Sequence, residues 1–275
     1  MRGVAAGGMV SALEDLGLTN VFDSVHGSSA GAAAAAYFAV GQAKVGTSLF
    51  YEDLNDGRFI SRSRILRGKP ILDASFLVDY AMCQLKPFNF AGLRDAPKLH
   101  VVSTDIDCGK TYVVSEFPSA EYYRDVLKAS ITLPLIAGKA RLVDGRRLLD
   151  GGLLQQIALT SAVEAGASHI FALVTRGERE IYRDRPTFKT KLESLALQGL
   201  YGGKVGQLYY ERNRRINEQV DQIVAGATHS GVPIMAIGLP AGMNYIDRLT
   251  TDAGLMRRAA GEAYDYTITN FGHLV

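Results

Sequence analysis

Val25-His26-Gly27-Ser28-Ser29-Ala30-Gly31 is the stretch of this sequence that decides the fold. It contains a Gly-x-Ser-x-Gly pattern centred on Ser29, which is typical of a nucleophile elbow, a sharp turn from a strand into a helix. Gly27 and Gly31 carry no Cβ atom, so they permit the close backbone approach that such a turn needs. Apolar residues before the turn predict a short strand, and residues 32–36 predict a helix after it. The pattern therefore predicts a serine hydroxyl that projects toward a substrate.

The predicted helix beside Ser29 also offers backbone N–H groups at its N-terminus. These donors have no acceptor within the helix, and the helix dipole is positive at that end. They suit the negative charge that develops on an oxyanion. A loop rich in Gly, Ser and Ala can match the same pattern by chance, so a second motif is needed to support the interpretation.

The composition is that of an ordinary globular protein and narrows its class. The chain has 275 residues, 47% of them hydrophobic and 21% charged, which is enough for a substantial core. A net charge of +2 gives no argument for a nucleic-acid partner. The two cysteines lack the spacing of a zinc site or a disulfide framework, so the sequence predicts no metal. Without an 18-residue apolar run or a signal peptide, we expect a cytoplasmic protein whose contact with membranes would be peripheral.

Strand and helix signals alternate along the chain, which predicts an α/β fold with a single domain over residues 1–275. The core motifs occupy residues 1–175, and residues 176–275 form a helical extension with one more strand. The predicted helices cover residues 5–16, 32–36, 122–130, 153–165, 187–227 with a break near 202–203, and 252–271. The predicted strands cover residues 21–25, 99–104, 111–114, 169–174 and 232–237, together with a hairpin over 141–149 that turns at Asp144-Gly145.

Residues 44–97 are less regular and contain a basic cluster and a set of apolar residues. The first is a basic cluster, which predicts a solvated face or contact with anionic headgroups: Arg58, Arg62, Arg64, Arg67 and Lys69. The second is a set of apolar residues, which predicts ordinary core packing for most members and the lining of an acyl pocket or cap for the others: Phe50, Phe59, Ile60, Ile71, Leu72, Phe76, Leu77, Phe88 and Phe90.

Leu148-Leu149-Asp150-Gly151-Gly152 is a second polar landmark, and it directly follows the predicted hairpin. An acidic residue at a strand end, followed by two glycines, can sit in a tight turn and point into a cleft. A purely structural turn explains the stretch equally well when it is taken alone. A serine hydroxyl, however, is a poor nucleophile until a base takes its proton. Asp150 is the candidate base, provided that its surroundings give it a suitable pKa.

A histidine base is the alternative that the sequence leaves open. The chain order of an α/β-hydrolase triad is serine, then an acid, then histidine, which makes His169, His229 and His273 candidates. His169 begins a predicted strand, His229 lies in a polar loop and His273 is close to the end of the chain. His26 would point to the opposite face of its strand, and His100 opens an apolar strand.

Together the two motifs resemble those of the patatin-like phospholipase family. Gly27–Gly31 and Asp150–Gly152 are similar to its Gly-x-Ser-x-Gly and Asp-Gly-Gly motifs. The resemblance covers residues 1–175 in consistent order, and the last hundred residues match loosely, mainly at Leu249–Ala263. Four further segments resemble the family's opening segment, its first helix, its Ala-Ser-x-x-x-Pro segment and its helix-to-strand junction: Arg2-Gly3-Val4, Leu13–Gly17, Lys128–Pro134 and Ala165–Ile170.

This resemblance implies a three-layer α/β/α fold with a mainly parallel central sheet. It implies a lipid acyl hydrolase that cleaves carboxylic esters of phospholipids or related lipids through an acyl-enzyme, with no metal and no other cofactor. Ser29 would be the nucleophile and Asp150 the base, without a histidine. The remaining site residues would be those of the Asp-Gly-Gly motif and of the oxyanion and turn motifs: Gly151 and Gly152, and Arg2, Gly3, Gly27, Ala30 and Gly31.

The opening of the chain departs from the family pattern. Met1-Arg2-Gly3 matches only the last three positions of a strand followed by Gly-Gly-Gly-x-Arg-Gly. We therefore expect the first strand and the glycine loop, whose amides help to form the oxyanion hole, to be missing. Losing one such donor costs on the order of 3 kcal/mol of transition-state stabilisation. Either the start has been assigned too far downstream, or the chain is truly short and acts as an impaired, lipid-binding or regulatory protein.

Overall fold

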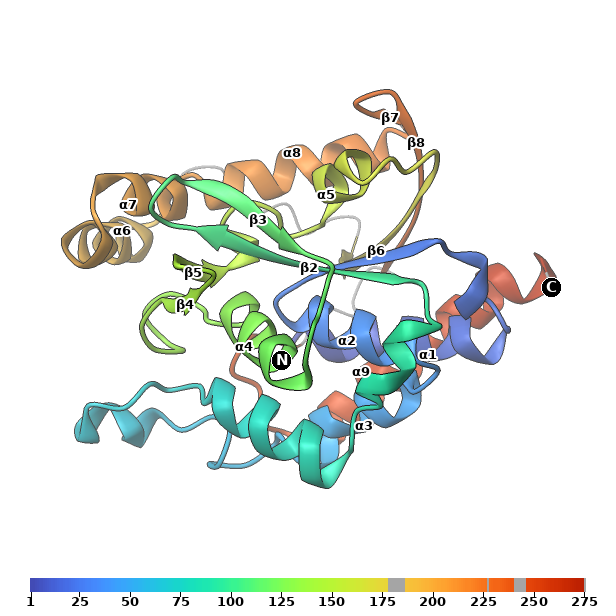
Figure 1. Ribbon diagram of the computed structural model, residues 1–275, viewed down its shortest axis with the longest axis horizontal. Helices are drawn as coiled ribbons and strands as arrows, with labels where there is room; N and C mark the ends of the chain where they lie inside the picture. The colour runs from blue at the N-terminus through green and yellow to red at the C-terminus, as the bar shows by residue number, and fades with distance from the viewer. Residues whose placement is uncertain (178–185, 227, 240–245, 275) are drawn as a thin grey trace.

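The computed structural model describes residues 1–177, 186–226, 228–239 and 246–274, and its strands lie between two layers of helices (Figure 1). This arrangement confirms the predicted α/β/α class. Five strands form one sheet: β1 (Ser24–Ser28), β2 (Lys98–Asp105), β3 (Lys110–Val114), β4 (Arg141–Val143) and β5 (Arg146–Asp150). Three strands form a second sheet: β6 (Ile170–Gly177), β7 (Thr228–His229) and β8 (Val232–Leu239).

The pairing of β2 brings the two sequence motifs together. β1 runs parallel to β2, with Ser28 opposite Val102, and β5 runs antiparallel to β2, with Asp150 opposite Ser103. Because Val102 and Ser103 are consecutive, the ends of β1 and β5 meet on the same strand. The other parallel pair is β6 with β8, whereas β3, β4 and β7 pair antiparallel with their neighbours, so the sheets are mixed.

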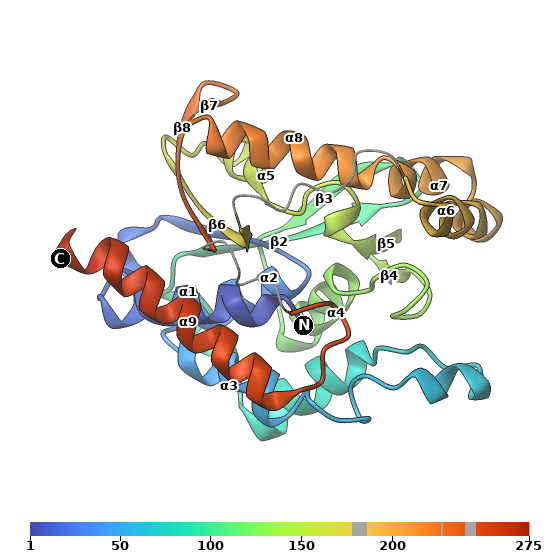
Figure 2. The same ribbon diagram turned by 180° about the vertical axis from the view of Figure 1, so that it is seen from behind.

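The helices divide between the two faces of the strands. One face is covered by α1 (Gly3–Asp15), α2 (Ala30–Ala39), α3 (Ala43–Glu52), α4 (Ala120–Ser130) and α9 (Ala253–Phe271), which lie below the strands in Figure 1. The opposite face carries α5 (Leu159–Glu164), α6 (Phe188–Tyr201), α7 (Gly203–Tyr210) and α8 (Arg212–Val224), and the view from behind shows the same division (Figure 2). None of the described helices combines the length and the apolarity that crossing a bilayer requires.

α1 and α9, which are close to opposite ends of the sequence, lie side by side (Figures 1 and 2). Their contact depends on small residues, since a Cβ atom on Gly8 would collide with the carbonyl oxygen of Ala260. Met9 is fully buried and packs in the same cluster as Ala263. Because α1 is buried from Gly3 to Leu13, it holds its N-terminal end firmly in the interior.

Residues 60–72 form an excursion that we call the arm, and it protrudes from the body in both views (Figures 1 and 2). Its base is closed by a β-bridge between Ile60 and Leu72 and by a hydrogen bond from the Ser61 amide to the Ile71 carbonyl oxygen, 2.9 Å long. Its tip is a short 3₁₀ helix, Arg62–Arg67.

Most of the predicted elements are present, with boundaries that differ by a few residues. The hairpin turn is confirmed as type I′, since Asp144 and Gly145 both have positive φ angles, 50° and 72°. The predicted break between two helices is confirmed at Gly202, where φ is 94°. Besides the predicted strand at 232–237, which is β8, the C-terminal part contains the two-residue strand β7.

Three element predictions were wrong. The strand expected over residues 21–25 begins only at Ser24, because Thr19–Val21 forms a 3₁₀ turn. The helix expected over 153–165 is confined to Leu159–Glu164, because the chain first makes the 3₁₀ turn Gly151–Leu153 at the Asp-Gly-Gly motif. The segment 44–97, expected to be irregular, contains α3 and the ten-residue helix Phe76–Leu85, whose residues Leu77, Val78, Ala81 and Met82 are buried in the core.

Candidate active site

Ser29 lies in a sharp turn between β1 and α2, with φ 58° and ψ −131°. A residue with a side chain rarely adopts a positive φ, and such a conformation costs on the order of 1–3 kcal/mol. The strand and the helix approach each other closely at the turn, because a Cβ atom on Gly27 would collide with the backbone of Ala32. The geometry is that of a nucleophile elbow, and its strain is held by the surrounding structure.

A short segment that begins at the end of α4 supports both halves of the site. The Ser29 amide donates to the Ser130 hydroxyl at 3.0 Å, and this hydroxyl donates to the Val102 carbonyl oxygen at 2.6 Å. Two residues later, the Thr132 carbonyl oxygen accepts from the Asp150 amide at 3.0 Å. Ser130 and Thr132 are completely buried. The segment therefore fixes the backbone of Ser29 and of Asp150 relative to each other.

Asp150 is almost completely buried at the end of β5, with 2% of its surface exposed. Its Oδ1 atom accepts from the Gly152 amide at 2.8 Å, and its carbonyl oxygen accepts from the Thr104 hydroxyl at 3.0 Å. A side chain at Gly151 would collide with the Val102 carbonyl oxygen, so only glycine allows β5 and β2 to approach in this way. Oδ1 of the carboxylate is thus hydrogen-bonded within the turn, and Oδ2 is available to accept a proton.

Burial raises the pKa of the Asp150 carboxyl above the usual range for aspartate. The largest influence in the opposite direction is the nearby Ser29 hydroxyl, followed by the Gly152 amide and the charge of Arg248. Ser29 and Asp150 do not meet the geometry of a full hydrogen bond, and Oδ2 is buried without a partner among the described residues. A carboxylate in this environment is a better base than an exposed one.

Ser29 and Asp150 open onto one cavity of about 250 Å³. Of the other site residues that the sequence predicted, five line the same cavity: Arg2, Gly3, Ala30, Gly31 and Gly152. Gly27 and Gly151 do not line it, and instead pack against backbone beneath the turns. The structure therefore gathers the predicted residues at one place, with two of the glycines in a supporting position.

The N-terminal ends of two helices meet at this cavity. Gly3 begins α1 and Ala30 begins α2, and a Cβ atom on Gly3 would lie only 2.5 Å from the Cβ atom of Ala30. The first amides of a helix have no acceptor within it, and both helix dipoles are positive at this end. The two helix ends can therefore stabilise negative charge beside Ser29.

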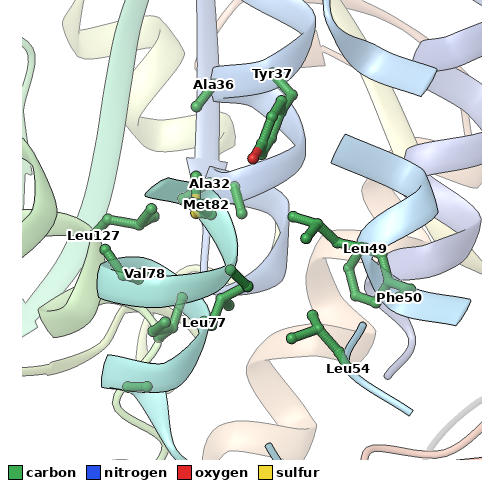
Figure 3. Close-up of a cluster of buried hydrophobic side chains, with 14 of the residues drawn as sticks. Ala32, Ala36, Tyr37, Leu49, Phe50, Leu54, Leu77, Val78, Met82 and Leu127 are labelled. Atoms are coloured by element: carbon green, nitrogen blue, oxygen red, sulfur yellow. The ribbon is translucent and has the colours of Figure 1, made fainter. Parts of the chain in front are cut away.

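One wall of the cavity is apolar. Leu49, Phe50, Leu54 and Leu77 line it, and their side chains come together from α3 and the neighbouring segments (Figure 3). Of the nine apolar residues that the sequence singled out between the motifs, Phe50, Phe59, Leu72 and Leu77 line the cavity. The other five pack in or against the main core cluster: Ile60, Ile71, Phe76, Phe88 and Phe90.

Another wall of the cavity is cationic, and the sequence did not predict it. Arg212 and Arg248 line the cavity, and both are close enough to Asp150 to lower the pKa of its carboxyl. Arg212 is the first residue of α8, in a polar segment where an arginine resembles an ordinary surface residue. Arg248 lies in the turn between β8 and α9. Only the tertiary structure brings these two side chains to the site.

None of the five histidines, all of which lie in the described part of the chain, lines the cavity. Nδ1 of His26 is 2.9 Å from the Ser161 hydroxyl, and the His26 ring stacks on His100 with 4.1 Å between ring centroids. His229 contacts Thr160 and Gln222. The last two, His169 and His273, are exposed. Nor do the described residues contain a group of three His, Cys, Asp or Glu side chains that could hold a metal ion.

Comparison with protein families gives a match to the model described as patatin-like phospholipase, over residues 1–163. Comparison with curated protein sequences gives no significant match. The matched range contains Ser29, Asp150 and the supporting segment at Ser130. Arg212 and Arg248 both lie outside it.

Proposed function

Since the chain belongs to the patatin-like phospholipase family, we propose that it is a serine acyl hydrolase that cleaves carboxylic ester bonds of lipids with Ser29 as nucleophile and Asp150 as base. The observation that carries this proposal is the shared cavity. Ser29 and Asp150 open onto it together with an apolar wall, and no histidine does. The residues that line the cavity therefore support a Ser–Asp dyad rather than a Ser-Asp-His triad.

In the proposed reaction, the Asp150 carboxylate takes the proton of the Ser29 hydroxyl while Oγ attacks the carbonyl carbon of the ester. The tetrahedral intermediate collapses, the bond to the alcohol oxygen breaks, and the alcohol leaves with the proton that Asp150 returns. Water then attacks the acyl-enzyme, Asp150 accepts a proton from it, and the fatty acid is released as Ser29 recovers its hydrogen.

The oxyanion of each tetrahedral intermediate would receive hydrogen bonds from the first amides of α2 and α1, those of Ala30 and Gly3. Both residues line the cavity, and both helix ends carry partial positive charge. Donors fixed in this way need no rearrangement when the charge develops. The acyl chain would lie along the apolar wall, where each buried methylene contributes about 0.8 kcal/mol to binding.

We also propose that the arm contacts the lipid surface. Ile65 and Leu66 are 59% and 89% exposed at its tip. Arg58 and Arg64 are paired with Asp56 and Asp73, whereas three basic residues of the arm have no ion pair within the described part of the chain: Arg62, Arg67 and Lys69. Exposed apolar side chains beside free cations suit an anionic membrane surface. Leu72 at the base of the arm lines the cavity, so docking would bring the cavity to the lipid.

The experiment that tests the function measures hydrolysis of a p-nitrophenyl ester and of phospholipid vesicles by the wild-type chain and single variants. We expect Ser29→Ala and Asp150→Asn each to reduce kcat by at least about 10⁴-fold, as removal of a nucleophile or its base does in serine hydrolases. His169→Ala, His229→Ala and His273→Ala serve as matched controls and should retain activity.

Each alternative predicts a different result. A comparable loss in one histidine variant would replace the dyad by a Ser-Asp-His triad. Covalent labelling of Ser29 by a fluorophosphonate without ester turnover would favour an impaired hydrolase. Absence of both labelling and turnover would favour a lipid-binding or regulatory protein.

A further inference from the structure

We propose that Arg212 and Arg248 form a binding site for a phosphate group of the ester substrate, which makes the enzyme selective for phosphorylated over neutral lipids. This inference rests on the proposed function, because the two arginines open onto the cavity that contains Ser29 and Asp150.

Arg212 is fixed with its guanidinium near the cavity. The group stacks on the Tyr209 ring, with 4.6 Å between the guanidinium carbon and the ring centroid. Its Nε atom is buried and has no hydrogen-bond partner among the described residues. Burial and the neighbouring charge of Arg248 lower the pKa of Arg212, so the site places two cations close together.

Arg248 is held by the turn that contains it. The Asp247 carboxylate accepts from the Leu249 amide at 2.6 Å, and the Thr250 hydroxyl accepts from the Asp247 amide at 2.9 Å. Asp247 is thereby engaged with backbone rather than with the Arg248 guanidinium. Within the described residues, neither Arg248 nor Arg212 forms an ion pair.

Among the described residues that line the cavity, cationic side chains outnumber acidic ones. Asp150 is the only acidic side chain among its described lining residues, whereas Arg212 and Arg248 both line it. Placing two cations close together in a partly buried site is unfavourable unless an anion joins them. A bound anion would therefore stabilise this arrangement, and Asp150 alone cannot supply enough negative charge.

Phosphate is the anion that fits two arginines best. Each guanidinium presents several N–H donors in a fixed plane, which matches the several oxygens of a phosphate and allows paired hydrogen bonds. Arg212 comes from α8 and Arg248 from the turn before α9, so the two side chains can contact different oxygens of one group. A phosphate ester that reaches them from the cavity would present its acyl ester near Ser29.

The test compares two substrates that differ only in the phosphate: a 1-acylglycerol 3-phosphate and the 1-monoacylglycerol with the same chain. We expect the wild-type chain to have the higher kcat/KM for the phosphorylated substrate. Arg212→Gln and Arg248→Gln should each lower the ratio of the two kcat/KM values by about 10-fold to 100-fold, the effect of losing a charged hydrogen bond. Arg214→Gln is the matched control, because Arg214 is an exposed residue of the same helix that pairs with Glu218, and it should leave the ratio unchanged.

Arg212 and Arg248 could instead act only on the charge of Asp150. In that case both substrates would lose rate equally in the glutamine variants, and the acidic limb of the pH profile would move to higher pH, because losing a nearby cation raises the pKa of a carboxyl. That result would overturn the proposal. Arg248→Lys, which keeps the charge but not the paired donors, should retain part of the selectivity if the site binds phosphate.

Binding without turnover separates this inference from the proposed function. In the Ser29→Ala background, we expect dodecyl phosphate to bind in a calorimetric titration and to bind at least about 10-fold more weakly after Arg212→Gln or Arg248→Gln. Inorganic phosphate should bind much more weakly, because it leaves the apolar wall empty.

Equal affinity for inorganic phosphate would mean a site for the free ion and would overturn the substrate role. Equal affinity for dodecanoate would mean a carboxylate site and would overturn the choice of phosphate. Arginine-dependent binding of dodecyl phosphate by a chain that hydrolyses no ester would contradict the proposed function and leave the anion site intact.

Discussion

The two sides of the cavity are built by different means. On the reactive side, Ser29 and Asp150 are positioned by backbone: a strained turn, a strand register, and hydrogen bonds to Ser130 and Thr132. On the cationic side, Arg212 and Arg248 reach the cavity as long side chains from segments beyond residue 163, where the family match ends. The proposed chemistry would therefore depend on short stretches of backbone. The proposed recognition of phosphate would depend on side chains that come from distant segments.

This difference separates two kinds of variant that would lower the proposed activity. A change on the reactive side should lower the rate for every ester alike, because each ester uses the same nucleophile, base and oxyanion donors. A change on the cationic side should alter the relative rates of different esters.

Ser130→Ala should have the largest effect among the supporting residues. It leaves the Ser29 amide and the Val102 carbonyl oxygen without their buried partner. The loss is about 1–3 kcal/mol, which corresponds to a change in rate of about 10-fold to 100-fold. We expect kcat to fall by this factor equally for phosphorylated and neutral substrates. Ser194→Ala is the matched control, because Ser194 also donates to a carbonyl oxygen, that of Gly206, but neither residue lines the cavity. A loss confined to the phosphorylated substrate would contradict the assignment of Ser130 to the reactive side.

Leu66→Asp at the tip of the arm should affect only substrates in a membrane. Removing one exposed leucine from a lipid contact costs about 1.5 kcal/mol or more, which lowers vesicle binding and vesicle hydrolysis on the order of 10-fold. Hydrolysis of a short, water-soluble ester should not change. Leu142→Asp provides the control, since Leu142 is 71% exposed on the β4–β5 hairpin. If Leu66→Asp and Leu142→Asp lower vesicle hydrolysis equally, the proposal that the arm contacts the lipid surface is wrong.

Ser29→Gly should have the smallest effect, and it appears in stability rather than rate. Glycine relieves the strain of a φ of 58° but makes the unfolded chain more flexible. The free energy of unfolding should therefore be about 1 kcal/mol higher for Ser29→Gly than for Ser29→Ala. We expect Tm to be about 2–4 °C higher for Ser29→Gly than for Ser29→Ala. At Ser48, within α3, the glycine variant should instead have a lower Tm than the alanine variant, because glycine destabilises a helix. Equal Tm values for the Ser29 pair would mean that the turn stores no strain.

The sequence predicted the reactive side because its constraints are local. Gly27, Gly31, Gly151 and Gly152 stand next to Ser29 and Asp150, and a turn can be recognised from neighbouring residues. Ser130 belongs to a segment that resembled an Ala-Ser-x-x-x-Pro motif, but its bond to the Ser29 amide joins residues 101 apart in sequence. The partners in such a contact cannot be identified from either residue's local sequence.

The cationic side could not be predicted for a related reason. Arg212 begins a polar helix, where arginines usually face water, and Arg248 follows an aspartate that would be expected to pair with it. Their approach to Asp150 depends on how α8 and the turn before α9 pack on the rest of the fold. The helix predicted over 153–165 failed similarly, since its apolar spacing did not reveal the 3₁₀ turn that the buried Asp150 requires.

Whether Asp150 activates Ser29 without a histidine is tested by the pH dependence of a single rate. This is the rate at which a fluorophosphonate modifies Ser29, measured by peptide mass spectrometry. A protonated Asp150 cannot accept the serine proton, so the rate should fall as the pH drops through a single ionisation. Because burial raises the pKa of Asp150, that ionisation should lie above the usual range for aspartate. Asp150→Asn should react far more slowly and lose this pH dependence. Modification of Asp150→Asn at the wild-type rate would contradict the dyad. Loss of the pH dependence when a histidine is replaced would contradict it as well.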